Sequence, residues 1–255
     1  MPVLQHDGAA IAYEVYGQGY PVLLFAPGGM RSRMEMWHSP TTGPARSWND
    51  WTGVLAKTYR VVAMDQRNAG RSRAPIAADH GWHTYAADHL ALMDHLGHKR
   101  FHTLGGCIGS SFCLKLCEMV PERISAAVLQ NPIGLHPEHP SYFPESFAEW
   151  VREQQAARSD LDAAAVAAFG RTMWDGDFVF SVSRDFVKRC KVPCTVLPGN
   201  DTPHPAVTGA ELIRLLPGVE HLDPWKGPEH LAAQRAHVLA FLADRKSTRL
   251  NSSHG

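Results

Sequence analysis

One pentapeptide of the chain has the residue types and spacing that nucleophilic catalysis requires. Gly105-Gly106-Cys107-Ile108-Gly109 places a cysteine midway between two glycines, and glycines let the backbone pass closely through a sharp strand-to-helix turn. A helix that begins at this turn stabilises a thiolate on Cys107 through its unpaired N–H groups and its dipole. The N–H of Ile108 would then face the oxyanion of a tetrahedral intermediate. The alternative is a tight turn around a small buried thiol that does no chemistry.

The segments around the pentapeptide alternate between strand-like and helix-like patterns, which predicts a mainly parallel sheet flanked by helices. The expected strands are 9–16, 21–26, 59–64, 101–104, 124–129, 194–197 and 219–222. The expected helices are 47–57, 82–96, 108–119, 206–216 and 231–242. Cys107 therefore falls between a strand and a helix, as the turn requires.

Residues 134–188 interrupt this alternation and are rich in aromatic side chains such as Phe147 and Trp174. We expect them to form a small helical lid inserted into one domain that spans 1–245. Residues 246–255 (KSTRLNSSHG) have no periodicity and few apolar groups, which predicts a disordered tail. The same stretch resembles translated sequencing-adapter read-through, so we regard it as a possible artefact without a function.

Three blocks together resemble the α/β-hydrolase fold family. Gly105–Gly109 has the spacing of that family's nucleophile elbow, G-x-S-x-G, with cysteine in place of serine. Residues 65–72 (DQRNAGRS) are similar to its D-x-R-G-x-G-x-S turn, with Asn68 replacing a glycine. Residues 27–29 (PGG) follow a strand where the family has its oxyanion loop, but lack that loop's histidine. The resemblance extends over residues 9–243 and implies the α/β-hydrolase fold.

The resemblance also implies where the other catalytic groups lie. Backbone N–H groups of Gly29 and Ile108 would form the oxyanion hole. The family's acid follows a late strand, which implies Asp201, although an aspartate there also suits an ordinary turn. Its histidine lies in the loop after the last strand, which implies His230 as the base. His204, three residues after Asp201, stays open as the alternative base, and so does an incomplete triad.

A cysteine at the elbow makes the chemistry similar to that of dienelactone hydrolases. The resemblance thus implies a hydrolase that cleaves small esters, thioesters or lactones through a Cys-His-Asp triad and a thioester acyl-enzyme, without a cofactor. The aromatic lid would cover an apolar pocket for a small-molecule substrate. Two alternatives remain: a non-catalytic or degenerate member that binds a ligand, and a carbon–carbon-cleaving or lyase-type member of the fold.

Composition narrows the partners and the location that we expect. Lys+Arg and Asp+Glu number 25 each, so nothing points to nucleic acid or an acidic membrane. No apolar run approaches the roughly 20 residues that a membrane helix needs. The beginning of the chain shows no basic segment followed by an apolar one, the pattern of a secretory signal. We therefore expect a cytoplasmic protein, and the oligomeric state is left open.

The remaining cysteines and histidines carry no predicted chemistry. Five cysteines, an odd number without Cys-x-x-Cys spacing, argue against a disulfide framework and predict inert buried thiols rather than a metal site. Histidines 89 and 95 fall on the expected helix 82–96 and His98 follows it closely, all near aspartates, which indicates a solvated face.

Overall fold

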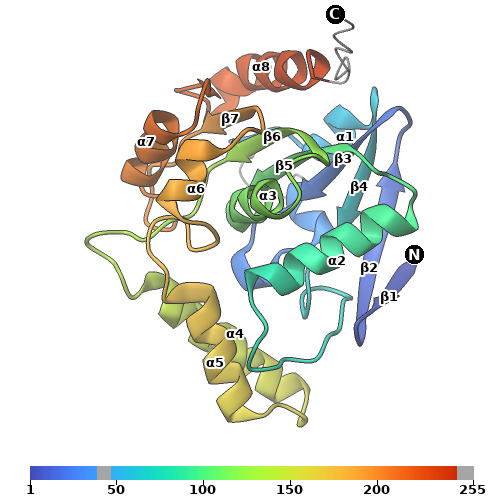
Figure 1. Cartoon of the computed structure of the whole chain (residues 1–255), viewed down its shortest axis with the longest axis vertical. Coiled ribbons are helices and arrows are strands. Elements are labelled where there is room, and N and C mark those ends of the chain that lie inside the picture. Colours follow the sequence, from blue (N-terminus) through green and yellow to red (C-terminus); the bar gives the residue numbers. More distant parts are fainter. Residues whose placement is uncertain (39–46, 246–255) are drawn as a thin grey trace, which may run out of the picture.

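An eight-stranded sheet forms the centre of the part of the chain that the computed structural model describes, residues 1–38 and 47–245 (Figure 1). The strand order is β1-β2-β4-β3-β5-β6-β7-β8. Every pair from β4 to β8 is parallel, whereas β1–β2 and β2–β4 are antiparallel. This confirms the predicted α/β architecture. The strands are β1 (Val3–His6), β2 (Ala9–Tyr16), β3 (Tyr20–Phe25), β4 (Tyr59–Met64), β5 (Phe101–Gly106), β6 (Ile124–Gln130), β7 (Cys194–Leu197) and β8 (Glu220–His221).

Helices connect and cover these strands. The α-helices of the described residues are α1 (Trp51–Leu55), α2 (Trp82–His95), α3 (Ile108–Met119), α4 (Tyr142–Ala157), α5 (Ala163–Trp174), α6 (Arg184–Arg189), α7 (Ala206–Leu215) and α8 (Leu231–Ala243). Three short 3-10 turns are η1 (Gly29–Arg31), η2 (Met34–Trp37) and η3 (Pro228–His230). Among the described residues, no helix combines the length and the apolar character that crossing a bilayer demands.

The expected elements agree with this order, and the differences lie at the ends of the sheet. The edge strand β1 was not predicted, because only Leu4 of its residues is buried and no alternation stands out. The other edge strand, β8, is shorter than the expected 219–222. Helix α1 likewise fills only part of 47–57. Short edge elements make few contacts, so their sequences carry a weak pattern.

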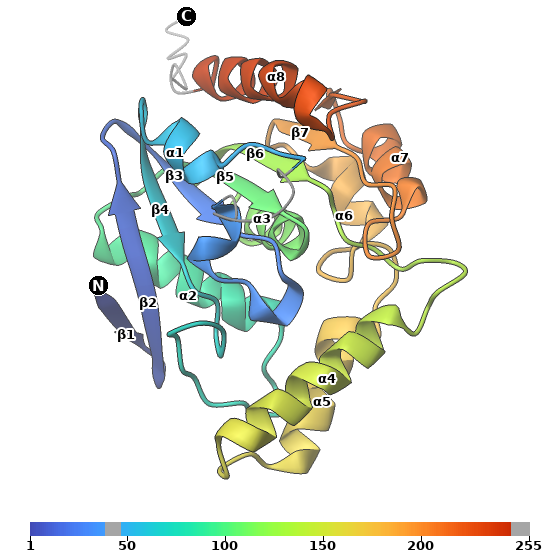
Figure 2. The ribbon, with the colours of Figure 1, turned by 180° about the vertical axis from the view of Figure 1, so that it is seen from behind.

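Alternating side chains of the central strands divide the core into two layers. In β3, Val22 and Leu24 pack in the layer covered by α1 and α8, whereas Leu23 and Phe25 pack in the layer covered by α2 and α3. Figures 1 and 2 show these helix pairs on opposite faces of the sheet. Both faces of each inner strand are therefore buried, which explains their continuous apolar runs.

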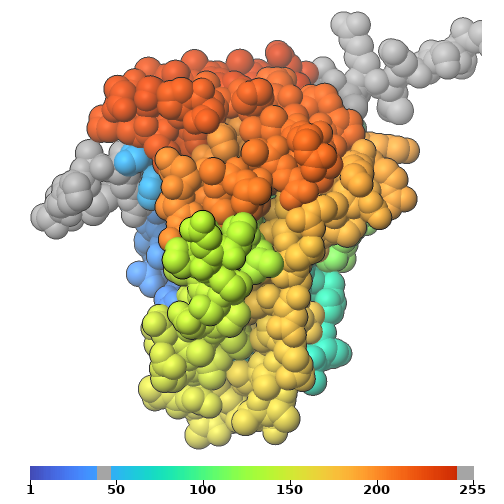
Figure 3. Space-filling model, turned by 90° about the vertical axis from the view of Figure 1, so that its left-hand side faces the viewer, coloured from blue at the N-terminus to red at the C-terminus, as the bar shows by residue number. Residues whose placement is uncertain are grey.

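The insertion between β6 and β7 contains α4, α5 and α6. Helices α4 and α5 lie side by side, away from the sheet (Figures 1 and 2), and the insertion forms the lower part of the face seen in Figure 3. It is joined to the core by polar contacts. Arg31 donates to both carboxylate oxygens of Glu153 at 2.8 Å, and the indole of Trp82 donates to the Met173 carbonyl at 3.1 Å. The tail expected at 246–255 lies outside the described residues.

Candidate active site

Cys107 occupies a strained turn between β5 and α3. Its φ of 57° and ψ of −122° lie in a region that residues with a side chain rarely adopt. The turn is held by neighbouring backbone groups: the Cys107 N–H donates to the Gln130 carbonyl at 3.0 Å. The Ser110 hydroxyl donates to the Gly105 carbonyl at 2.9 Å and to the Gln130 carbonyl at 3.0 Å. These bonds hold Cys107 at the N-cap of α3, where its thiol is partly exposed.

Glycine at position 105 is a steric requirement of this turn. A Cβ atom there would lie 2.1 Å from the backbone of Gly109 in the first turn of α3. Such an approach is far inside van der Waals contact, so any side chain at Gly105 would push α3 away from the end of β5. The glycine spacing of the pentapeptide thus follows from the close passage of two backbone segments.

A second loop, between β3 and η2, lies beside the cysteine and is fixed by the turn after β4. The buried carboxylate of Asp65 accepts from the Met34 N–H at 3.0 Å, and the Gln66 N–H donates to the Ser32 carbonyl at 3.0 Å. Asn68, which replaces the glycine of the family's turn, has a φ of 56°. Asparagine tolerates this left-handed conformation better than most residues, so the turn keeps its shape.

Two backbone N–H groups point at the cysteine sulfur. They belong to Gly28, on the loop after β3, and to Ile108, the first residue of α3. Ile108 was expected there, whereas the other expected donor was Gly29. The N–H of Gly28 instead acts on the Cys107 thiol. Gly29 lines the adjoining pocket, and its role as a donor to the oxyanion stays a prediction.

His204 is the histidine that faces Cys107. It ends the turn Asp201-Thr202-Pro203-His204 after β7, in which the His204 N–H donates to the Asp201 carbonyl at 3.0 Å. Its Nδ1 hydrogen-bonds the Asp201 carboxylate. Its Nε2 is buried and makes no hydrogen bond within residues 1–38 and 47–245, and the charge of the Cys107 thiol acts on the ring. Lys226 contacts the other Asp201 oxygen at 3.2 Å. Carboxylate and imidazole are thus hydrogen-bonded, and the thiol is coupled to the imidazole through its charge.

The charges of these three groups shift all three of their pKa values. Burial alone would raise the pKa of the Cys107 thiol, but the His204 charge and hydrogen bonds from His204, Gly28 and Ile108 outweigh it and lower the pKa. Burial alone would lower the pKa of His204, yet Cys107 and Asp201 together raise it to about 9. The pKa of Asp201 falls to about 2, because the contacts with His204 and Lys226 outweigh burial. The arrangement therefore stabilises the Cys107 thiolate and the His204 imidazolium relative to their neutral forms.

His230, the first choice for the base, is not the histidine beside the elbow. It ends η3 at the start of α8, where its Nε2 lies 3.3 Å from Glu229 Oε1. It does not line the pocket that contains Cys107. After the two-residue strand β8 the chain passes Trp225 and Lys226, which approach the site, before it reaches His230. The last loop therefore contributes a lysine contact to Asp201 and leaves the imidazole position to His204.

The signal for His204 was present in the sequence. A four-residue turn brings its first and last residues close together, so Asp201 and His204 can meet without help from the rest of the fold. Gly199, just before the turn, is also required, since a Cβ there would lie 2.3 Å from the His204 Cβ. Only the placement of β7 beside β6 decides whether this Asp–His pair lies near Cys107.

A pocket of about 500 Å³ opens above Cys107 and His204. Its walls are mainly apolar and come from the loop after β3, the insertion and the last loop; the large side chains among them are Met30, Met36, Trp48, Tyr142, Phe143, Trp174 and Trp225. Gln130, Asn131 and Ser146 add polar groups. Phe143 and Trp174 stack with ring centroids 4.9 Å apart. A volume and lining of this kind suit a small organic molecule.

Comparison with known proteins places the chain in a family. Residues 21–184 match the family model described as alpha/beta hydrolase fold. The chain belongs to this family. Among curated proteins, "Putative carbamate hydrolase RutD" of Pseudomonas syringae pv. syringae (strain B728a) is 35% identical over 89 residues, which are 35% of this chain and 34% of that protein. The RutD protein of Variovorax paradoxus (strain S110) is 33% identical over 90 residues, 35% of this chain and 34% of that protein. These matches thus cover about a third of the relatives' own length.

Solved structures extend the likeness over nearly the whole chain. The enol-lactonase from Burkholderia xenovorans LB400 is 20% identical, with a TM-score of 0.68 over 95% of this chain and 100% of that one. The meta-cleavage product hydrolase from Pseudomonas fluorescens IP01 is 17% identical, with a TM-score of 0.70 over 96% of this chain and 98% of that one. At these identities the likeness establishes the α/β-hydrolase fold alone.

Proposed function

We propose that this α/β-hydrolase cleaves small esters, thioesters or lactones with Cys107 as nucleophile, His204 as base and Asp201 as the residue that orients the base. The observation that carries the proposal is the contact of the Asp201 carboxylate with the His204 imidazole, whose buried Nε2 is unpaired among the described residues and whose charge acts on the Cys107 thiol. A nucleophile, a base and a group that orients the base are the three parts of covalent acyl transfer. The same contact disfavours a non-catalytic role for this pocket.

The first half-reaction acylates the cysteine. The Cys107 thiolate attacks the substrate carbonyl carbon, a C–S bond forms, and the carbonyl electrons move to oxygen. The N–H groups of Gly28 and Ile108, which act on the sulfur in the free enzyme, would donate hydrogen bonds to the resulting oxyanion. The protonated His204 then donates its Nε2 proton to the leaving alkoxide or thiolate as the bond to the leaving group breaks.

The second half-reaction releases the acid. The now neutral His204 takes a proton from a water molecule, and the oxygen of that water attacks the thioester carbonyl. The second tetrahedral intermediate collapses with loss of the Cys107 thiolate, which restores the thiolate–imidazolium pair. Asp201 keeps Nε2 directed at the sulfur in both steps through its hydrogen bond to Nδ1.

The pocket supports a small acyl group with apolar character. Its volume of about 500 Å³ and its aromatic walls suit substrates of roughly drug size or less. A lactone fits the same scheme, because its alkoxide stays attached to the acyl group and the product leaves as one hydroxy acid. The printed name of the enol-lactonase neighbour is compatible with this class but, at 20% identity, does not decide it.

A panel of substrates tests the proposal. Nitrophenyl esters of increasing chain length, a thioester and a lactone are offered to the reduced enzyme. We expect turnover on at least one class, with a decline beyond the chain length that the pocket holds. Iodoacetamide should abolish turnover in step with labelling of Cys107. No turnover on any of the three classes, or full turnover after Cys107 is labelled, would refute the proposal.

Carbamate hydrolysis is a second candidate, favoured by one observation. The sequence match to RutD proteins covers 89 residues at 35% identity. A carbamate carbonyl would enter the same scheme, with an amine or alcohol as leaving group. Adding carbamate and simple aryl carbamates to the panel distinguishes the two: a rate on carbamates that exceeds the ester rate would favour this candidate.

A further inference from the structure

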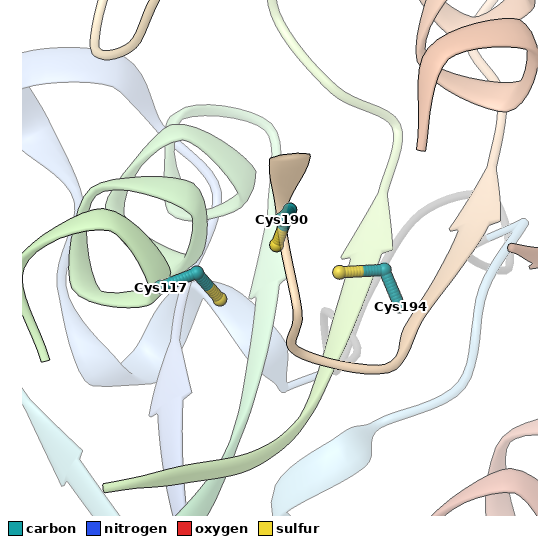
Figure 4. A group of neighbouring side chains, drawn as sticks. All are labelled: Cys117, Cys190 and Cys194. Carbon is teal, nitrogen blue, oxygen red and sulfur yellow. The ribbon is translucent and has the colours of Figure 1, made fainter. Parts of the chain in front are cut away.

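Three buried thiols meet on the side of α3 that faces the beginning of β7. Cys117 lies near the end of α3, Cys190 follows α6, and Cys194 begins β7. Their sulfur atoms all lie within 4.8 Å of one another, and in Figure 4 they point into the space that the three side chains share. Each residue is at most 4% exposed. The metal-free, inert role predicted from spacing took no account of this meeting, because Cys117 is 73 residues before Cys190 in the chain.

The loop between α6 and β7 brings two of the sulfurs to one point. The thiols of Cys190 and Cys194 both lie against the carbonyl oxygen of Val192, at 3.8 Å and 3.3 Å. Both side chains therefore project to the same side of the loop, toward α3. A nearby thiol, Cys113, stands one turn earlier on α3, and it is not one of the three sulfurs that lie within 4.8 Å of one another.

We propose that Cys117, Cys190 and Cys194 form a binding site for one soft, thiophilic d10 cation, such as Cu⁺ or Cd²⁺, separate from the substrate pocket. Thiolates select soft cations over Mg²⁺, Ca²⁺ or Mn²⁺. A metal–sulfur distance of about 2.3 Å in a trigonal complex places the sulfurs about 4 Å apart. The group reaches this spacing by a contraction of less than about 1 Å from its 4.8 Å limit. Each thiol that binds releases its proton to solvent, and no electron is transferred.

The surroundings offer an entrance and compensating charge. A surface hollow of about 520 Å³ reaches Cys190 and is lined by the loop residues up to Pro193. Arg189, Lys191 and Arg245 also line it. A divalent ion held by three thiolates carries one net negative charge, which these cationic side chains offset. A cation could thus reach the sulfurs through a short path from the surface.

A bound cation would join two elements that position the candidate active site. Helix α3 begins directly after Cys107, and β7 leads into the turn that carries Asp201 and His204. A metal that holds Cys117 to Cys194 would stabilise the packing of α3 against β7. Because the unfolded chain does not hold the three sulfurs together, binding favours the folded state.

Cadmium titration of the fully reduced protein tests the site. The titration is done in a Cys107→Ser background, which removes the thiol beside His204 as a competing ligand. We expect one equivalent of Cd²⁺ to produce the ultraviolet thiolate-to-cadmium charge-transfer band, with no competition from excess Mg²⁺. Cys190→Ser and Cys194→Ser in this background should each lose most of the band. The matched control, Cys113→Ser on the same helix, should keep the band in full.

Stability measurements separate loss of binding from loss of folding. Saturating Cd²⁺, about a hundredfold above the dissociation constant, should raise the Tm of the Cys107→Ser protein by at least about 5 °C and leave the Tm of Cys194→Ala unchanged. A band that persists in a folded Cys194 variant, or that Cys113→Ser loses equally, would overturn the proposal. So would an absent band and an unchanged Tm. A loss of two thiols on exposure to air, together with an absent band, would overturn it in favour of a disulfide pair.

Discussion

Helix α3 has a thiol environment at each end, and the two differ in exposure and in the groups that surround the sulfur. At its beginning, Cys107 is partly exposed to a pocket and faces the imidazole of His204. Near its end, Cys117 is buried against the sulfurs of Cys190 and Cys194. The first thiol has an acid–base partner and room for a substrate. The second has other sulfurs as its neighbours, two of which contact the Val192 carbonyl, and none of the three thiols lines the pocket that contains Cys107.

The groups that surround a thiol, rather than the cysteine side chain itself, decide which chemistry it can perform. A nucleophile needs a stabilised thiolate, access and a proton acceptor. A soft-cation site needs several sulfurs at a shared distance and protection from competing ligands. We propose that Cys107 meets the first set of conditions and that the three-sulfur group meets the second, so the two proposals can be tested separately.

Removal of the first thiol should produce the largest effect. Cys107→Ala should lower the hydrolysis rate by at least about a thousandfold, because no other group can form the acyl-enzyme. Cys113→Ala, a buried thiol on the same helix, should retain activity within a few-fold once its Tm shows that it is folded. The measurement is kcat/KM on the best ester of the panel. Near-normal activity of Cys107→Ala would remove the basis of the comparison.

The next largest effect should come from the imidazole. His204→Ala should cost at least about a hundredfold in rate, the usual scale for loss of a general base. His230→Ala is the matched control, and it should remain within a few-fold of wild type, because its ring contacts Glu229 outside the pocket. Steady-state kinetics of both variants decide the point. A larger loss of rate in His230→Ala than in His204→Ala would identify His230 as the base.

Alkylation rates should separate the two environments directly. Iodoacetamide at neutral pH should modify Cys107 at least about ten times faster than any cysteine of the buried group, since a thiolate must be both stabilised and accessible. Peptide mapping by mass spectrometry at short times gives the order of labelling. Early labelling of Cys190 or Cys194 would mean that the three-sulfur group opens to solvent.

The pH profile should give the smallest but most specific effect. The reactive form has Cys107 deprotonated and His204 protonated. As pH rises through the lowered Cys107 pKa the rate should rise, and as pH rises through about 9 His204 loses its proton and the rate should fall. At one pH unit above that value kcat/KM should be about tenfold below its maximum, as for any single ionisation.

The Asp201→Asn variant tests whether His204 causes the alkaline limb of the pH profile. It removes a carboxylate that raises the His204 pKa, so the alkaline limb should move to lower pH. An alkaline limb that stays in place in this variant would show that another group, rather than His204, titrates there.

Local sequence carried much of the prediction. The pentapeptide around Cys107 has to be a strand-to-helix turn because its glycines permit a backbone approach that a Cβ atom would block. The runs of apolar residues in β3 and β4, bounded by turn residues, indicated strands that are buried on both faces. In contrast, His89 was expected on a solvated helix face, and this was wrong. The fold covers that side of α2, and the His89 Nε2 lies 2.7 Å from the Gln66 side chain.

The sequence by itself determined the mainly parallel α/β architecture and the turn at Cys107, because these depend on the burial pattern of single segments and on short-range sterics. The resemblance of three motif blocks implied the α/β-hydrolase fold, and the short turn allowed Asp201 and His204 to meet. Only the tertiary structure decided which histidine faces the thiol and which N–H groups point at it. It alone also brought Cys117 to Cys190 and Cys194. These contacts depend on how the parallel strands β6 and β7 align and on the path of the loops that follow them. Local residue patterns do not predict the distances between segments that are remote in the sequence.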